Sequence, residues 1–167
     1  ETLECWEIAL KSHNTPSAIA LSRQKVPYIN PKNSKKNKCE NGAYLVNITS
    51  HESNITIVAS GTEVELALKV QNKLKEINIH SKVVSMPCME LFDNQPEEYK
   101  KDLLEENSLV VTLEAGSITS WQKYIKNKGL NLGIDQFGES APYKEVYNHF
   151  NLTEEKITGL ILKKLRE

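Results

Sequence analysis

The sequence predicts an α/β fold, namely an open, mostly parallel (mixed) five-stranded sheet with helices on both faces. Short apolar runs rich in β-branched residues, of which 55–59 is the clearest, alternate with segments whose apolar residues keep helical spacing. The run 55–59, a helix over 64–77 and the run 80–86 form a strand–helix–strand succession, which requires parallel strands joined by a right-handed crossover. Because 55–59 has almost no polar interruption, we expect it to be buried on both faces of the sheet.

The segment before Gly42 differs in character from the rest. Apolar residues at helical spacing predict a helix over 1–11, and the apolar run that follows predicts a buried strand over 18–21. From 25 to 41 the chain is rich in lysine, asparagine and proline with no apolar period, which predicts an interdomain linker. A solvated loop is favoured there over an anion-binding patch, because the lysines are not interleaved with aromatic residues. Since neither a cap residue nor an initiator methionine precedes the first helix, we expect a fragment of a longer protein.

The regular part of the chain begins at Gly42. Strands are expected where β-branched apolar runs occur, and helices where the apolar residues keep a helical period. Thr153 is placed to cap the last helix. The expected strands are 43–49, 55–59, 80–86, 108–113 and 130–135, and the expected helices are 64–77, 88–93, 96–104, 120–125, 142–150 and 153–165.

Composition and charge exclude several classes of protein. The 167 residues are 39% hydrophobic and 26% charged, which is typical of a globular chain with one main core. The net charge of −1 gives no basic field for nucleic acid, and no apolar run approaches the ~20 residues that span a membrane. We therefore expect no nucleic-acid partner, no membrane and a cytoplasmic location. Cys5, Cys39 and Cys88 have no CxxC spacing, so free thiols are expected rather than a disulfide framework or a zinc site.

The loops at the carboxyl ends of the strands are the candidate site, because ligands of open parallel sheets bind there. Ser60, Gly61 and Thr62 place a glycine and two hydroxyls at a helix N-terminus, where an anion would be favoured. They lack the further glycines of GxGxxG and the lysine of a P-loop. A structural cap between strand and helix is therefore favoured over a nucleotide site.

A small-molecule crevice at the same edge is the other interpretation of these loops. Glu114, Asp135 and Glu139 would bring carboxylates to it, although carboxylates at strand ends also cap helices. The four histidines are far apart and there is no GxSxG elbow, which argues against a catalytic triad. The residues of the candidate crevice are Ser60, Gly61, Thr62, Glu114, Gly138, Glu139 and Ser140.

Arg23 differs in kind from these loop residues. It stands directly after the expected strand 18–21, where the sheet would hold the base of the side chain. A guanidinium held in this way presents a rigid fork that suits phosphate or carboxylate. A salt bridge to a neighbouring helix is the competing interpretation.

Seven segments of this chain resemble those of the transketolases, in the order and at the spacing of that family. The resemblance extends over nearly the whole chain. Two of them, Ser85-Met86-Pro87 and 137–142, favour this family over the related β subunits of 2-oxo acid dehydrogenases and the deoxyxylulose phosphate synthases. The segments are Trp6-Glu7-Ile8-Ala9-Leu10, Leu21-Ser22-Arg23-Gln24, Ser60-Gly61-Thr62-Glu63-Val64-Glu65-Leu66-Ala67, Val83-Val84-Ser85-Met86-Pro87, Leu91-Phe92-Asp93, Glu114-Ala115-Gly116 and Phe137-Gly138-Glu139-Ser140-Ala141-Pro142.

The resemblance implies that the chain is the C-terminal piece of a homodimeric enzyme of the pentose phosphate pathway. That enzyme moves a two-carbon ketol unit between sugar phosphates on thiamine diphosphate, with Mg²⁺ or Ca²⁺. Residues 1–24 would end its pyrimidine-binding domain, 25–41 would be a linker, and 42–167 would be the transketolase C-terminal domain. The arginine of the family's Leu-Ser-Arg-Gln segment contacts the sugar phosphate, and here it is Arg23.

The resemblance also implies what this piece lacks. The glycine-aspartate-glycine segment that holds metal and diphosphate is absent, as are the activating glutamate and the channel histidines. We therefore expect no catalytic residue, no bound cofactor or metal and no activity in the piece alone, which would contribute Arg23 and support of the dimer. Two other interpretations stay open, a free-standing regulatory module that binds a small molecule and a purely structural dimerisation domain. The unpaired strand expected at 18–21 favours the enzyme part over both.

Overall fold

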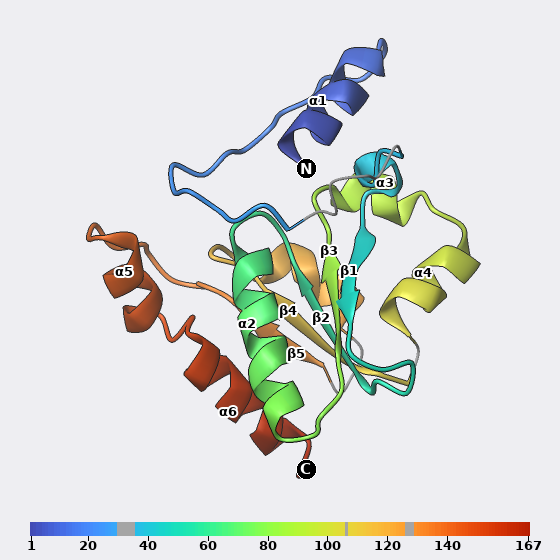
Figure 1. Ribbon diagram of the computed structural model, residues 1–167. Helices are drawn as coiled ribbons and strands as arrows, with labels where there is room; N and C mark the ends of the chain where they lie inside the picture. Colours follow the sequence, from blue (N-terminus) through green and yellow to red (C-terminus); the bar gives the residue numbers. More distant parts are fainter. Residues whose placement is uncertain (30–35, 106, 126–128) are drawn as a thin grey trace.

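The structure is a computed structural model that describes residues 1–29, 36–105, 107–125 and 129–167. A five-stranded sheet forms its centre and carries helices on both faces, as the sequence predicts (Figure 1). The strands are β1 (Tyr44–Ile48), β2 (Ile55–Ala59), β3 (Lys82–Ser85), β4 (Leu109–Leu113) and β5 (Leu130–Leu132). The helices are α1 (Thr2–Lys11), η1 (Cys39–Asn41), α2 (Glu63–Glu76), α3 (Met89–Asp93), α4 (Glu97–Leu104), η2 (Thr119–Tyr124), α5 (Tyr143–His149) and α6 (Glu154–Lys164), of which η1 and η2 are 3₁₀ helices.

The strand order is β1-β3-β2-β4-β5. Strands β3, β2, β4 and β5 are parallel, and β1 pairs antiparallel with β3, so the sheet is mixed. Ala59, at the end of β2, is aligned with Ser85 on one side and with Leu113 on the other. The carboxyl ends of these three strands therefore meet at one edge of the sheet.

The core lies on both faces of β2. All five residues of this strand are buried, which confirms the expectation from its uninterrupted apolar sequence. Ile55 and Ile57 point into a cluster that α2 and α6 cover, whereas Val58 points into a second cluster under α3, α4 and η2. Burial of one such side chain contributes about 1.5–3 kcal/mol, so these two clusters hold the layers together.

The first turn of the regular domain depends on Gly42. Its φ angle of 77° lies in the left-handed region, and a Cβ atom there would come within 2.2 Å of the backbone nitrogen of Phe92 and 2.4 Å of the backbone oxygen of Cys88. The Cys88 N–H donates to the Gly42 carbonyl at 3.1 Å. Glycine at this position lets the start of β1 lie directly against α3.

Residues 12–29 contain neither helix nor strand, so the strand predicted over 18–21 is wrong for this structure. A strand requires a neighbouring strand to take its backbone hydrogen bonds, and none of the described strands pairs with this segment. Most of the segment is exposed. The expected linker 25–41 is described only in part: residues 39–41 form η1, and 30–35 lie outside the described residues.

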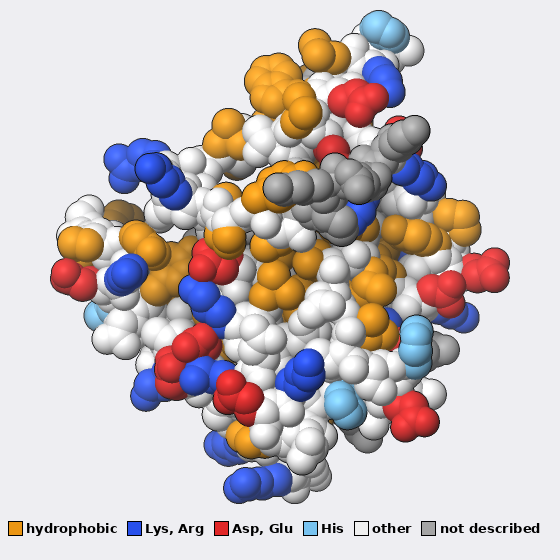
Figure 2. All heavy atoms as spheres, viewed as in Figure 1, with side chains coloured by type: hydrophobic (Ala, Val, Ile, Leu, Met, Phe, Trp, Pro, Cys, Tyr) orange, Lys and Arg blue, Asp and Glu red, His pale blue; other side chains and the backbone are white. Residues whose placement is uncertain are grey.

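Helix α1 has two different faces. Its partly buried residues, Glu1, Glu4, Cys5 and Ile8 among them, follow the helical spacing and face η1. The opposite face exposes three large apolar side chains, and Figure 2 shows the hydrophobic atoms that gather over this end of the molecule. These side chains are Leu3 (83% exposed), Trp6 (50%) and Leu10 (72%).

Other boundaries differ from the expected ones by a few residues. The helix expected over 120–125 is a 3₁₀ helix one residue earlier, and α5 begins after Pro142 rather than at it. The last helix begins after Thr153, whose hydroxyl accepts a hydrogen bond from the Lys156 N–H at 3.4 Å, as a cap residue should.

Candidate functional site

The candidate site is built where β2 and β4 end side by side. Because Ala59 and Leu113 are aligned in register, the residues that follow them, Ser60 and Glu114, leave the sheet as neighbours. The Ser60 hydroxyl donates to Oε2 of Glu114 at 3.1 Å. The indole N–H of Trp121, a fully buried side chain of η2, donates to the same oxygen at 3.2 Å. Strand register and η2 together fix the Glu114 carboxyl group.

A second carboxylate lies at the start of α2. Glu63 is buried, with 4% of its surface exposed, and it stands in the first turn, where the helix dipole favours negative charge. The Thr62 hydroxyl donates to its Oε1 at 2.6 Å, and the Tyr147 hydroxyl of α5 donates to the same atom. The Thr62 and Tyr147 hydroxyls are 3.3 Å apart. This cluster therefore connects α5 to the N-terminus of α2.

The environment of Glu114, including the charge of Glu63, perturbs its carboxyl group. Burial raises the pKa of Glu114 above its ordinary value, and the negative charge of Glu63 raises it further, while the donors Ser60 and Trp121 act in the opposite direction. Burial, followed by the hydrogen bond to Glu63, also raises the pKa of Tyr147, so its hydroxyl stays a neutral donor at physiological pH. Among the described residues, this edge of the sheet is thus an acidic cluster whose hydrogen-bond donors already bind the chain's own carboxylates.

The structure brings only part of the expected crevice together. Ser60, Thr62 and Glu114 gather at the ends of β2 and β4. Gly61 is exposed with a φ angle of 51°, and no atom lies within 4 Å of the place a Cβ would take. Gly138, Glu139 and Ser140 are all exposed in the loop before α5, and no hydrogen bond or ion pair of theirs joins this cluster in the described part of the chain.

Three residues of the cluster are not among the site residues predicted from the sequence, namely Glu63, Trp121 and Tyr147. Glu63 could have been recognised from the sequence, because an acidic residue in the first turn of a helix that follows a buried strand lies at the ligand-binding edge of the sheet. Tyr147 could not, since its place beside α2 depends on how α5 packs.

Arg23 is exposed and lies in the segment without secondary structure. The argument that a strand would hold the base of its side chain therefore does not apply in this structure. The next residues, Gln24, Lys25 and Val26, line a groove of about 310 Å³ together with α2 and the C-terminal helices. The segment that carries Arg23 thus lies against the regular domain.

The comparisons with known proteins agree on one family. The model of the transketolase-like TK C-terminal domain matches residues 42–153. The chain belongs to the transketolase C-terminal domain family. Transketolase from Aquifex aeolicus is 39% identical over 166 residues, which are 98% of this chain and 24% of that protein. The chloroplastic transketolase of Solanum tuberosum is 36% identical over 95% of this chain and 22% of its own length. The chain therefore spans about a quarter of the length of these curated transketolases.

Solved transketolase structures share the fold of the whole chain. Campylobacter jejuni transketolase superimposes with a TM-score of 0.85 at 36% identity, over 97% of this chain and 24% of that one. A Pichia stipitis transketolase in complex with sedoheptulose 7-phosphate gives a TM-score of 0.89 at 31% identity, over 99% of this chain and 24% of that one. These similarities do not favour the 2-oxo acid dehydrogenase, deoxyxylulose phosphate synthase or free-standing module interpretations.

The described residues at the strand ends do not fit thiamine diphosphate or its metal ion. Within the described ranges, no group of three or more His, Cys, Asp or Glu side chains is placed to hold a metal. The carboxylates at the strand ends would repel a diphosphate, and their donors Ser60, Thr62 and Tyr147 are already engaged. Among the described helices, none has the length and apolar character needed to span a membrane.

Proposed function

We propose that this chain acts as the C-terminal part of a complete transketolase, which transfers a two-carbon ketol unit between sugar phosphates. The single observation that carries the proposal is the similarity to transketolases over 98% of the chain, including the segment before the regular domain. The complete enzyme is a cytoplasmic homodimer that uses thiamine diphosphate with Mg²⁺ or Ca²⁺ in the pentose phosphate pathway. The part described here has no activity by itself.

The proposed division of labour follows the change in character along the chain. Residues 1–24 complete the pyrimidine-binding domain, 25–41 connect, and 42–167 form the C-terminal domain. The exposed apolar face of α1 supports this division, because three large apolar side chains on one helix face are what a further packed domain would cover. The carboxylates Glu63 and Glu114 have a structural role in this proposal, since they hold α5 and η2 to the sheet edge.

Arg23 is the residue that we assign to the substrate. Its guanidinium would bind the terminal phosphate of the sugar, far from the reacting carbonyl, through charge-assisted hydrogen bonds. Its exposure in this structure leaves the side chain free to reach a ligand between domains. Such a contact positions the substrate and should be expressed mainly in KM.

The test is Arg23→Gln in the complete enzyme, with Lys25→Gln as the matched control, because Lys25 is an exposed cation two positions away. We expect Arg23→Gln to lose roughly 2–4 kcal/mol in kcat/KM for a phosphorylated acceptor, mostly through KM, and little for an unphosphorylated one. Lys25→Gln should leave both values close to wild type. Equal losses on both acceptors would mean that Arg23 maintains the fold or the dimer, and the substrate role would be wrong.

A further inference from the structure

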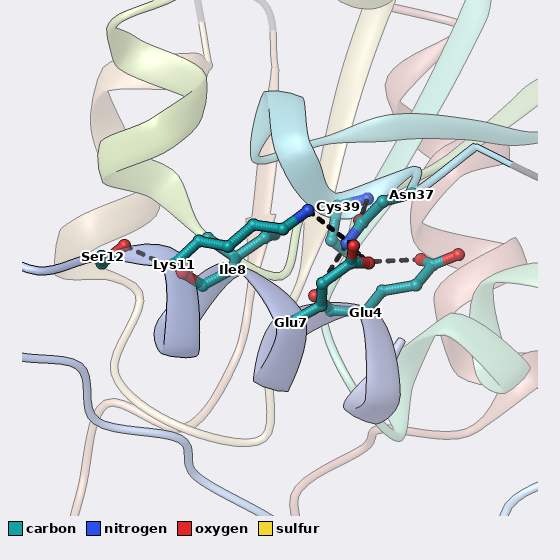
Figure 3. Close-up of polar contacts among 7 residues, drawn as sticks. All are labelled: Glu4, Glu7, Ile8, Lys11, Ser12, Asn37 and Cys39. Atoms are coloured by element: carbon teal, nitrogen blue, oxygen red, sulfur yellow. Dashed lines mark hydrogen bonds and ion pairs between the residues drawn. The ribbon is translucent and has the colours of Figure 1, made fainter.

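Two cysteines meet where α1 touches the start of the regular domain. The turn at 37–39 is fixed on the helix by Asn37, whose Nδ2 donates to the Glu4 carbonyl at 2.9 Å and to Oε2 of Glu7 at 2.9 Å (Figure 3). Its Oδ1 accepts the Cys39 N–H at 2.9 Å. Both functional ends of one asparagine amide therefore hold Cys39 against the face of α1 that carries Cys5.

The Cys39 thiol is directed at α1. Its Sγ lies 3.2 Å from Oε2 of Glu4, and a side-chain hydrogen bond joins it to the thiol of Cys5. Cys39 is buried, with 1% of its surface exposed, whereas Cys5 is partly exposed at the helix margin. Solvent therefore reaches Cys5 more readily than the buried Cys39.

The same hydrogen bond makes the two thiols unequal. The interaction with Cys39 lowers the pKa of Cys5, against the opposing effects of burial and of the Glu1 and Glu4 charges. The bond to Cys5 is also the main reason that the pKa of Cys39 is raised. Because a lowered pKa favours the thiolate, which is the form that attacks disulfides, Cys5 is the more reactive thiol of the pair.

We propose that Cys5 and Cys39 are a redox pair that forms a reversible disulfide between α1 and η1 in the presence of a low-molecular-weight disulfide. The Cys5 thiolate attacks one sulfur of oxidised glutathione and releases one glutathione thiolate, which takes up a proton. Cys39 then loses its proton and attacks the Cys5 sulfur of the mixed disulfide, which releases the second glutathione. Two thiols are oxidised and one disulfide is reduced to two glutathione molecules, so atoms and electrons balance.

This disulfide would fasten α1 to η1. Between the end of α1 and η1 the described residues form no helix or strand, so α1 is attached to η1 through side-chain hydrogen bonds such as those of Asn37 and Glu4, which the covalent bond would reinforce. Cytosolic disulfides of this kind are transient and sense redox state. The bond would be reversed by excess reduced glutathione.

Cys88 provides the internal control. It is partly exposed like Cys5, but burial raises its pKa, and its thiol contacts Glu90 at 3.5 Å rather than another cysteine. It should react slowly with oxidised glutathione and should not be cross-linked.

The test is a non-reducing peptide map of the chain after incubation with oxidised glutathione. Wild type and Cys88→Ala should give the Cys5–Cys39 cross-linked peptide, which reduced glutathione removes, and Cys39→Ala should give only the glutathione adduct of Cys5. In the wild type alone, alkylation by iodoacetamide should be about tenfold faster at Cys5 than at Cys88 near neutral pH, and Cys39→Ala should move the pH midpoint of Cys5 alkylation upward. A Cys5–Cys88 product of equal yield, or three thiols that all stay alkylatable, would overturn the proposal.

Discussion

Removal of one hydroxyl, in Tyr147→Phe, should loosen α5 from the rest of the domain. Helix α5 has no fully buried residue, so it depends on the contact of Tyr147 with the buried carboxylate of Glu63 more than a core helix would. A hydrogen bond to a charged group contributes about 1.5–3 kcal/mol. The Thr62 hydroxyl still donates to Glu63, and water reaches the half-buried site, so we expect a loss near the lower end, about 1–2 kcal/mol.

The loss should be local before it is global. Because α5 is attached at the edge of the domain, its amides should exchange through opening of this helix rather than through complete unfolding. A loss of 1–2 kcal/mol corresponds to amide exchange about 5–30 times faster in α5, with a much smaller change in β2. Hydrogen exchange followed by mass spectrometry measures both segments in one sample, and urea denaturation gives the global free energy of unfolding.

Tyr143→Phe is the matched control for this experiment. Tyr143 is on the same helix, is 48% exposed and packs edge-to-face on the ring of Tyr147 at a centroid distance of 6.0 Å. Its hydroxyl is not part of the Glu63 cluster, so the substitution should leave exchange in α5 nearly unchanged. If both variants speed amide exchange in α5 equally, or if neither does, the cluster does not hold this helix. The structural role given to Glu63 would then be wrong.

Two further predictions concern single residues at strand ends and turns. Since the pKa of Glu114 is raised in the folded state, that state binds the proton more tightly than the unfolded one, and stability should fall as the pH rises from the ordinary value of 4.5 through the raised pKa. Glu114→Gln should remove this slope and be at least as stable as wild type at neutral pH, whereas Glu139→Gln should keep it; urea midpoints across the pH range decide, and an unchanged slope in Glu114→Gln would refute the assignment. Gly42→Ala should destabilise the domain by roughly 2–5 kcal/mol, because a methyl group must meet backbone atoms of α3 in a left-handed conformation, while Gly138→Ala, which has open space, should stay within about 0.5 kcal/mol of wild type. Thermal denaturation compares the two, and similar melting temperatures would contradict the crowding at Gly42.

The sheet could be predicted from the sequence because its signals are local. Strand β2 is a run of five buried residues, and the helix that follows keeps an apolar stripe, so the type and order of the elements follow from periodicity alone. Strand ends follow less well. The last strand ends at Leu132, and beyond it the Ile134 N–H bonds the Gly116 carbonyl at 2.8 Å. This contact depends on where the loop after β4 lies, which cannot be recognised in the sequence.

The segment 18–21 shows that an apolar sequence pattern alone does not establish a strand. Its apolar composition predicts a strand, yet backbone hydrogen bonding to a neighbour is what makes a strand, and composition does not reveal whether a neighbour is present. The site divides in the same way. Ser60 and Glu114 could be paired from parallel register alone, whereas the contact between Glu63 and Tyr147 requires the position of α5, which is set by packing far along the chain.

The position of the antiparallel edge strand bears on the order in which the sheet assembles during synthesis. β1 is the first strand of this sheet to be made, but the strand beside it is β3, and β2 is made in between. At about 5–20 residues per second, the interval between the end of β1 and the end of β3 lasts roughly 2–7 s. Throughout it the parallel pair that will form the centre has no edge for β1 to join. We therefore expect β1 to be added to the sheet only after β2 and β3 have paired.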